Sequence, residues 1–260
     1  YIYIYYMDIL FEINSYFSEN NIKQIEGTTS TTQLKYFSDF IKNKNYKKYL
    51  EIGYHMGHSV NTILHSNSNI IATSIDLFPH KYADLCIEFT KTKFKDRFNF
   101  IKGSSFDILP TINEKYDVIF IDGDHSYNGV KKDLNNCLNL CHEDTIIIMD
   151  DLVPFHKWGI DVCRVWNEFI DENKIIPLDV IGEFGNGGTL KSYSSNNPLF
   201  ALDSKNKIIN NNNNLLNYNG NISCRRWGIL KKNFGNTNIN DNLKIISDRF
   251  DKIPINEQPI

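Results

Sequence analysis

The sequence of 260 residues predicts an α/β protein with a doubly wound, mostly parallel sheet of seven strands. Short apolar segments alternate with amphipathic segments of helical period, which is the pattern of strands joined by crossover helices. The apolar segments are continuous rather than alternating, as expected for strands that are buried on both faces. Several of them end in acidic residues, and ligands of such sheets bind beyond the carboxyl ends of the strands.

Two amphipathic helices are expected before the first strand, and we assign residues 1–45 to an N-terminal helical cap. The first helix spans about residues 8–20. The second begins at an N-cap on Thr31 or Thr32 and continues to Lys42. These helices either cover a ligand pocket on the sheet or only pack against its edge.

The sheet domain is expected over residues 46–232, followed by an irregular, polar tail over residues 233–260. The expected strands lie at residues 49–52, 70–76, 98–102, 116–121, 145–149 and 224–230, with further apolar segments at 177–184 and 189–193. The expected helices between them begin at Gly57 and at about residues 82, 129 and 159.

The first expected strand ends in a turn around which the rest of the domain is arranged. Glu51 precedes Gly53 by two residues, and Gly57 follows four residues later at the start of a helix. A dinucleotide would need a glycine in place of His55, because its phosphates approach the bare backbone there. The free N–H groups of the helix start suit a carboxylate, whereas Glu51 attracts an ammonium group. S-adenosylmethionine combines a carboxylate, an ammonium and a nucleoside. The alternative is an ordinary turn whose glycines serve geometry only.

Two further strand ends complete the predicted nucleoside site. Asp76 lies 25 residues after Glu51 at the end of the second strand, where a carboxylate accepts hydrogen bonds from both ribose hydroxyls. The turn after the third strand contains Ser104 and Ser105, whose hydroxyl and N–H groups are candidates to contact the adenine edge. A solvated acid at the strand end is the alternative for Asp76.

Four carboxylates follow two neighbouring strands: Asp122, Asp124, Asp150 and Asp151. Four like charges in one cleft repel one another unless a positive charge lies among them. Mg²⁺ takes oxygen ligands and lowers the pKa of a bound hydroxyl. His125 titrates near neutrality and is a candidate to accept the proton of that hydroxyl. The alternative is that one or two of the acids only cap helices or face water.

The composition favours a globular protein of a reducing compartment, and we expect a cytoplasmic location. The net charge of −3 and the pI near 6.2 argue against a nucleic-acid-binding face. The five cysteines are odd in number, and their spacing matches no zinc pattern. The opening run 1–6 is too short to span a bilayer and lacks the basic start of a signal peptide, so no membrane partner is expected. A homodimer is compatible with the sequence.

Taken together, the motifs resemble those of the class I S-adenosylmethionine-dependent methyltransferases. The resemblance is carried by the segments 51–59, 103–105 and 120–127, by Asp76 and by the pair 150–151. Within this class the sequence is similar to the catechol O-methyltransferase-like and the macrocin (sugar) O-methyltransferase-like groups, over about residues 45–190. The resemblance implies a Rossmann-like fold, S-adenosylmethionine, Mg²⁺ or another divalent cation, and O-methylation of a small-molecule or glycan hydroxyl.

The resemblance also implies residue roles. The predicted metal ligands are Asp122, Asp150 and Asp151. The catalytic base is either His125, where the catechol group has a lysine, or Asp124, which matches the sugar group. The catechol group has an asparagine where this chain has Asp151, and the lysine is absent, so catechol itself is not the expected acceptor. The predicted cofactor contacts are Glu51, Gly53, His55, Gly57, Ser59, Asp76, Ser104, Ser105 and Asp122.

Other functions are compatible with the same motifs. A hydroxylase-like protein or a cofactor-binding scaffold would share the fold without methylating. A nicotinamide-dependent oxidoreductase is a third class, against which the absence of a glycine at His55 argues. Near the acceptor, His156, Trp158 and Trp227 are candidates for the wall, although core packing is the favoured role of the two tryptophans. The segments 28–32, 156–159 and 185–193 are the expected lining of this region.

Overall fold

The computed structural model describes residues 5–23, 29–78, 80–154, 156–184, 191–192, 207–208 and 224–235. Its strands are β1 (Lys48–Ile52), β2 (Ile71–Asp76), β3 (Phe98–Lys102), β4 (Tyr116–Ile121), β5 (Cys141–Met149), β6 (Ile175–Phe184), β7 (Lys191–Ser192) and β8 (Cys224–Lys232). Its helices are α1 (Tyr5–Glu19), α2 (Thr31–Ile41), α3 (His58–Ser66), α4 (Ala83–Phe94), α5 (Ser105–Ile108), α6 (Tyr127–Asn139) and α7 (Lys157–Asp171). Two 3₁₀ turns, η1 (Lys95–Arg97) and η2 (Leu109–Thr111), complete the elements.

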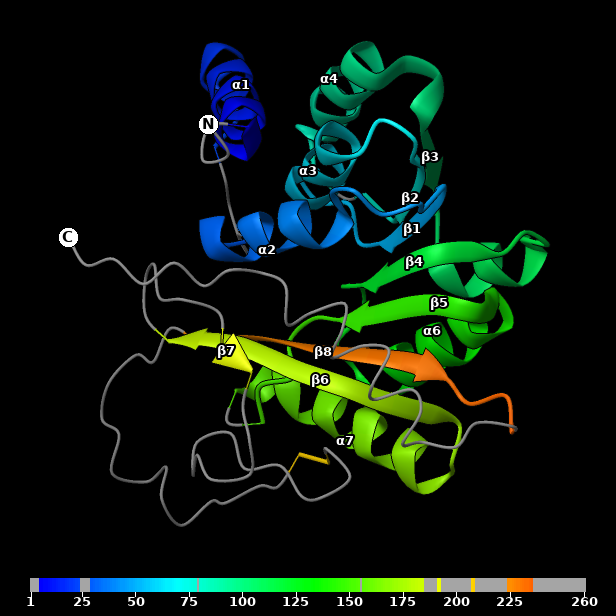
Figure 1. Cartoon of the computed structure of the whole chain (residues 1–260). Coiled ribbons are helices and arrows are strands. Elements are labelled where there is room, and N and C mark those ends of the chain that lie inside the picture. Colours follow the sequence, from blue (N-terminus) through cyan, green and yellow to red (C-terminus); the bar gives the residue numbers. More distant parts are fainter. Residues whose placement is uncertain are drawn as a thin grey trace.

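The strands form one mixed sheet in the order β3-β2-β1-β4-β5-β8-β6-β7 (Figure 1). Strands β1 to β5 pair in parallel, with β1 at the point where the order reverses, whereas β8 pairs antiparallel with both β5 and β6. The predicted doubly wound α/β fold is therefore confirmed. Seven strands are long, and the additional β7 contains two residues. The expected strand boundaries at 98–102 and 116–121 agree with β3 and β4.

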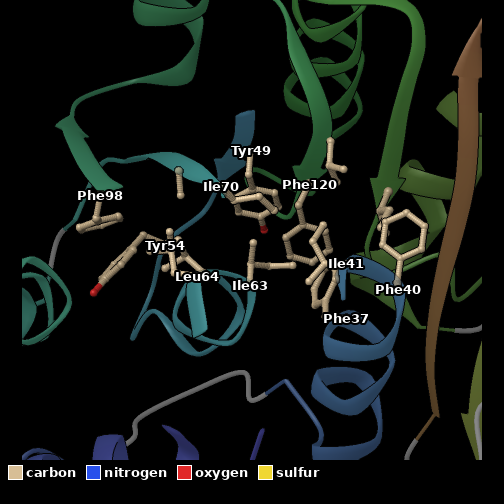
Figure 2. Packing of buried hydrophobic residues seen from close by; sticks show 14 of the residues in the cluster. Phe37, Phe40, Ile41, Tyr49, Tyr54, Ile63, Leu64, Ile70, Phe98 and Phe120 are labelled. Atoms are coloured by element: carbon tan, nitrogen blue, oxygen red, sulfur yellow. The ribbon is translucent and has the colours of Figure 1, made fainter. Parts of the chain in front are cut away.

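Helices cover both faces of the sheet. Residues of α1 to α4 pack on one face, and residues of α5 to α7 pack on the other. Figure 2 shows the first of these cores, where Phe37 of α2 lies against Phe120 of β4. The Phe37 ring also lies 4.6 Å from the ring of Trp227 in β8. Because these rings are fully buried, α2 is held against the centre of the sheet by apolar packing.

The start of α2 differs from the prediction. The N-cap is Ser30, and Thr31 and Thr32 are the first helical residues. The Ser30 hydroxyl accepts a hydrogen bond from the N–H of Gln33 at 3.1 Å, and the Gln33 amide oxygen accepts one from the N–H of Ser30 at 3.0 Å. This capping box needs a Gln or Glu three residues after the cap. Only Ser30 satisfies that spacing, because Leu34 and Lys35 follow the two threonines at the same distance.

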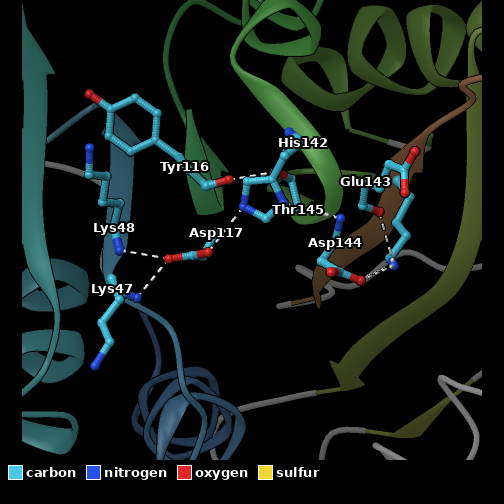
Figure 3. Close-up of polar contacts among 9 residues, drawn as sticks. Lys47, Lys48, Tyr116, Asp117, His142, Glu143, Asp144 and Thr145 are labelled. Atoms are coloured by element: carbon cyan, nitrogen blue, oxygen red, sulfur yellow. Dashed lines mark hydrogen bonds and ion pairs between the residues drawn. The ribbon is translucent and has the colours of Figure 1, made fainter. Parts of the chain in front are cut away.

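The amino edge of the sheet is fixed by one carboxylate. Asp117 of β4 accepts hydrogen bonds from the N–H groups of Lys47 and Lys48 at 2.6 and 2.9 Å (Figure 3). Its second oxygen lies 3.0 Å from Nε2 of His142 in β5. Asp117 therefore links β1, β4 and β5 at the edge opposite to the predicted site.

Several sequence expectations concern segments that the structure covers only partly. The helical cap over residues 1–45 contains α1 and α2, but the tail from residue 236 and the segment 185–190 lie outside the described residues. The domain boundaries stay predictions. Among the described cysteines, Cys86, Cys137, Cys141 and Cys163 are buried free thiols. None of the described helices is both long and apolar enough to cross a membrane.

The turn after β1 allows a direct test of backbone strain. Gly53 has φ +90°, and a Cβ built on it would lie 1.9 Å from the carbonyl oxygen of Asp122. We predict that Gly53→Ala lowers the free energy of unfolding by at least about 2 kcal/mol, measured by urea denaturation. Gly235 is the matched control, because it has φ +83° but no atom within 4 Å of the added Cβ. Gly235→Ala should cost about 1 kcal/mol from strain alone. Equal losses in both variants would contradict the predicted clash.

Candidate cofactor and metal site

The carboxyl ends of β1, β2 and β4 meet at Gly53. The N–H of Gly53 donates to the carbonyl of Ile75 at 2.9 Å, and the N–H of Asp122 donates to the carbonyl of Ile52 at 2.9 Å. These bonds continue the sheet by one residue beyond each strand. Because Gly53 has no Cβ, the Asp122 carbonyl can lie directly against it. The turn and the first predicted metal-binding acid are therefore held in contact.

Asp76, predicted to contact ribose, supports the same turn from the other side. One of its carboxylate oxygens accepts hydrogen bonds from the N–H groups of Tyr54 and His55 at 2.7 and 2.9 Å. The other oxygen accepts from the N–H of Phe78 at 2.7 Å. A carboxylate offers about four acceptor positions. Three are thus used by the backbone, and this number leaves capacity for a ligand hydroxyl.

His55 has a backbone conformation that favours glycine. Its φ is +48°, in the left-handed region, and its Nε2 lies 3.2 Å from the hydroxyl of Tyr82. Gly57, with φ +77°, then begins α3 as an N-cap without any side-chain hydrogen bond to the helix. A Cβ on Gly57 would meet the ring of Tyr54 at 2.6 Å, so the helix start lies tightly on the turn.

Glu51 is fully buried and surrounded by hydroxyl groups. The hydroxyl of Ser59 donates to one oxygen, that of Ser74 donates to the other at 2.8 Å, and that of Tyr49 lies at 3.2 Å. Burial raises the pKa of Glu51 to about 8, although these three hydrogen bonds oppose the shift. Ser59, predicted beside the cofactor, is thus a direct partner of Glu51. Ser74 was not predicted, although it pairs with Glu51 in the β1–β2 register.

The turn after β3 places the two predicted adenine-side serines in different roles. Ser104 caps α5, with its hydroxyl accepting from the N–H of Phe106 at 3.2 Å. The Ser105 hydroxyl donates to Asp133 of α6 at 2.6 Å. Asp133 is fully buried, and burial raises its pKa to about 6. This residue was not anticipated, although the signal was present: it stands in the apolar stripe of α6 between Val130 and Leu134.

Three of the predicted side chains at the ends of β4 and β5 converge. Ligand atoms of Asp122, His125 and Asp151 all lie within 4.8 Å of one another. Nε2 of His125 lies 3.2 Å from an oxygen of Asp151 and 3.6 Å from one of Asp122. The polar contact with Asp122 and the charge of Asp151 raise the pKa of His125.

The other two acids of the predicted cluster lie outside this group. Among the described residues, Asp150 does not join the three that share the 4.8 Å spacing. One of its oxygens accepts from the N–H of Asp151 at 2.7 Å, and burial of the carboxyl raises its pKa well above the usual range. Asp124 accepts hydrogen bonds from the N–H and the hydroxyl of Ser126, both at 2.8 Å. It therefore supports the start of α6.

The two tryptophans proposed for the acceptor wall differ in burial. Trp227 is 1% exposed and belongs to the core beside α2. Trp158 is 49% exposed, and its ring stacks on His156 at a centroid distance of 4.2 Å. A Cβ on Gly159 would lie 2.7 Å from the carbonyl oxygen of Asp151, so this start of α7 lies against the loop that carries the metal-site acid.

Comparisons with known proteins give a match to the segment that contains this carboxyl edge of the sheet. Residues 50–152 match a family model described as a methyltransferase domain. This segment is therefore similar to methyltransferase domains. It begins in β1 and ends directly after Asp151, so all the predicted cofactor, metal and catalytic residues lie inside it. The resemblance to class I methyltransferases is confirmed. No curated protein matches the chain in sequence.

Solved methyltransferase structures share the fold of this segment and of the elements around it. A protein of Klebsiella pneumoniae assigned as an O-methyltransferase is 14% identical, with a TM-score of 0.62, over 86% of this chain and 90% of that one. The O-methyltransferase of Bacillus cereus, solved in complex with SAH, is 17% identical with a TM-score of 0.57 over the same shares. TomG of Streptomyces achromogenes, in complex with SAM, is 16% identical with a TM-score of 0.56, over 71% and 86%.

The buried Glu51 predicts a defined pH dependence of stability. Its pKa of about 8 in the folded protein exceeds the usual value of about 4.3 in an unfolded chain. The stabilisation that the protonated form contributes is therefore complete below the unfolded value and is lost as the pH rises toward 8. Glu51→Gln removes this pH-dependent stabilisation. The free energy of unfolding of the variant minus that of the wild type should therefore rise by up to about 1.4 kcal/mol per pH unit between about pH 5 and 8.

Urea unfolding of both proteins at several pH values measures this difference, and contributions from all other titrating groups cancel in it. Above about pH 8 the difference should level off, because Glu51 is then ionised in both states. A difference that does not change with pH would contradict the assignment of a raised pKa to Glu51.

Proposed function

We propose that the chain is an S-adenosylmethionine-dependent O-methyltransferase that acts on a hydroxyl of a small molecule or a sugar with the help of a divalent cation. The observation that carries the proposal is the coincidence of the methyltransferase match with the carboxyl edge of the sheet. The matched segment contains the Gly53 turn, the Asp76 carboxylate and the group of Asp122, His125 and Asp151. One edge thus holds residues suited to both the cofactor and the acceptor hydroxyl.

The cofactor would lie over the Gly53 turn. Asp76 supports this placement, because its carboxylate is fixed by three backbone N–H groups and keeps acceptor capacity for a ribose hydroxyl. The N–H groups at the start of α3, which has no side-chain cap, suit the cofactor carboxylate. Glu51 fits a supporting role beneath the turn, where its hydrogen bonds hold Ser59 and Ser74 in place.

The residues present also fit a divalent cation. Asp122 and Asp151 supply carboxylate oxygens within 4.8 Å of each other, at the ends of adjacent strands. When bound, S-adenosylmethionine supplies an electrophilic methyl group and the cation supplies positive charge at the acceptor hydroxyl. The methyl group would pass from the sulfonium, which would leave as a thioether, to the acceptor oxygen, and the hydroxyl proton would pass to a base of the protein or to water. Asp124 and His125 are the proposed bases.

The acceptor would lie beside the start of α7. Trp158 is half exposed and stacked on His156, at a turn that contacts the loop of Asp151. An exposed aromatic ring at a turn that contacts the loop of Asp151 suits a ring-shaped acceptor, because the ring offers an apolar face to it.

Calorimetry with S-adenosylmethionine tests the cofactor part of the proposal. Asp76→Asn should weaken cofactor binding by about ten- to a hundredfold, since it removes the charge from the acceptor of a ribose hydroxyl. Asp96→Asn is the matched control: it makes the same change at an exposed residue just before β3, at the opposite edge of the sheet, and should leave the affinity unchanged. Thermal melting of both variants separates a loss of binding from a loss of fold.

The same titration with NADH, and a methyl-transfer assay with chelator and with added Mg²⁺ or Mn²⁺, complete the test. Binding of S-adenosylmethionine and cation-dependent transfer to hydroxyl acceptors support the proposal. Binding of NADH instead of S-adenosylmethionine would overturn it, and transfer unaffected by the chelator would remove the cation from it.

A further inference from the structure

We propose that His125 is itself a ligand of the cation, in the place that the sequence analysis gave to Asp150, and that the site therefore prefers a transition-metal ion such as Mn²⁺ to Mg²⁺. The inference rests on the proposed cation-assisted function and specifies its metal. It concerns the side chains at the ends of β4 and β5, where one imidazole and two carboxylates meet.

The spacing of the three ligand atoms fits one ion. Nε2 of His125 lies 3.2 Å from an Asp151 oxygen and 3.6 Å from an Asp122 oxygen. Two ligand atoms bound at about 2.1 Å to the same metal are about 3.0 Å apart at a right angle and about 3.4 Å apart at the tetrahedral angle. The two distances from the imidazole lie close to these values, and the two carboxylate oxygens lie within 4.8 Å of each other. Side-chain shifts would bring all three groups around one ion.

The backbone explains why His125 and Asp151 point into the group whereas Asp150 does not. His125 follows Asp122 by three residues in the loop between β4 and α6, which places both at one strand end. Asp151 has φ +56°, in the left-handed region that residues other than glycine rarely adopt, so the backbone turns at the second of the two acids. The Asp150 carboxylate instead accepts a hydrogen bond from the N–H of Asp151 within its own loop. Asp150 is thus not one of the three grouped ligands, although the charges of Asp151 and Asp122 still act on its carboxyl, and the imidazole supplies the third ligand.

An imidazole ligand changes which ions the site selects. Mg²⁺ prefers an oxygen shell, whereas imidazole nitrogen suits first-row transition metals, for which carboxylates are also good ligands. Three protein ligands leave open positions for water and for an acceptor hydroxyl. Because Nε2 has a single lone pair, His125 cannot bind the ion and accept the hydroxyl proton with the same atom. Of the two proposed bases, Asp124 then remains.

Electron paramagnetic resonance of Mn²⁺ bound to the full-length, tag-free chain tests the ligand directly. Electron spin-echo modulation detects ¹⁴N nuclei bound to Mn²⁺, so the wild-type protein should show a nitrogen coupling from imidazole. His125→Gln should abolish that coupling and weaken Mn²⁺ binding by about tenfold or more. The advantage of Mn²⁺ over Mg²⁺ in competition should shrink in this variant, because the remaining ligands are oxygens.

Two variants act as matched controls. His142→Gln removes the imidazole of a similar histidine–aspartate pair, with Asp117, at the opposite edge of the sheet (Figure 3). It should leave both the nitrogen coupling and the Mn²⁺ affinity unchanged. Asp150→Asn should also keep the coupling, with an affinity within about threefold, because Asp150 contributes no ligand in this scheme.

The outcomes separate this inference from the proposed function. Mn²⁺ bound without nitrogen coupling in the wild-type protein would overturn the role of His125 but would leave cation-assisted transfer in place. The absence of any bound Mn²⁺, together with intact S-adenosylmethionine binding, would overturn both the ligand assignment and the cation. The wild-type spectrum decides between these results even if His125→Gln fails to fold.

Discussion

The contact between Gly53 and the carbonyl of Asp122 is the constraint on which the candidate site depends. It is possible because β1 stands at the point where the strand order reverses, so that its carboxyl end lies between those of β2 and β4. Any larger residue at Gly53 would push the two strand ends apart. Asp76 holds the same turn from the β2 side through backbone N–H groups. The acid proposed to contact ribose and the acid proposed to contact the cation therefore lie on either side of one turn.

The acidic side chains of this edge are stabilised in different ways, and the differences define the chemistry of the site. Glu51 is buried among hydroxyl groups, whereas Asp124 is bound by Ser126 at the start of α6. Asp122 and Asp151 instead lie close to each other with the imidazole of His125 between them. Neighbouring carboxylates repel each other unless a positive charge lies between them. A protonated imidazole or a cation held by all three groups satisfies this requirement.

Much of the fold could be predicted from the sequence, because strand and helix signals are local. The continuous apolar run of β4 and its two terminal acids were sufficient to locate that strand and its end. The predicted N-cap of α2, on Thr31 or Thr32, lies one or two residues after the observed cap, because the capping box joins Ser30 to Gln33. The hydrogen-bond partners of buried polar groups were harder to predict from the sequence. Ser74 meets Glu51 through the register between two strands, and Asp133 meets Ser105 through the packing of α6.

The sequence by itself determined the class of fold, the methyltransferase resemblance and which residues stand at the carboxyl edge of the sheet. These follow from the order of apolar segments and from the residues that end them. Only the tertiary structure decided which of those residues face one another. Asp150 and Asp151 are adjacent in sequence and chemically identical, yet a left-handed backbone conformation at Asp151 places its carboxylate beside His125 and leaves that of Asp150 on its own loop. Such directions depend on neighbouring strands and turns, which no local pattern encodes.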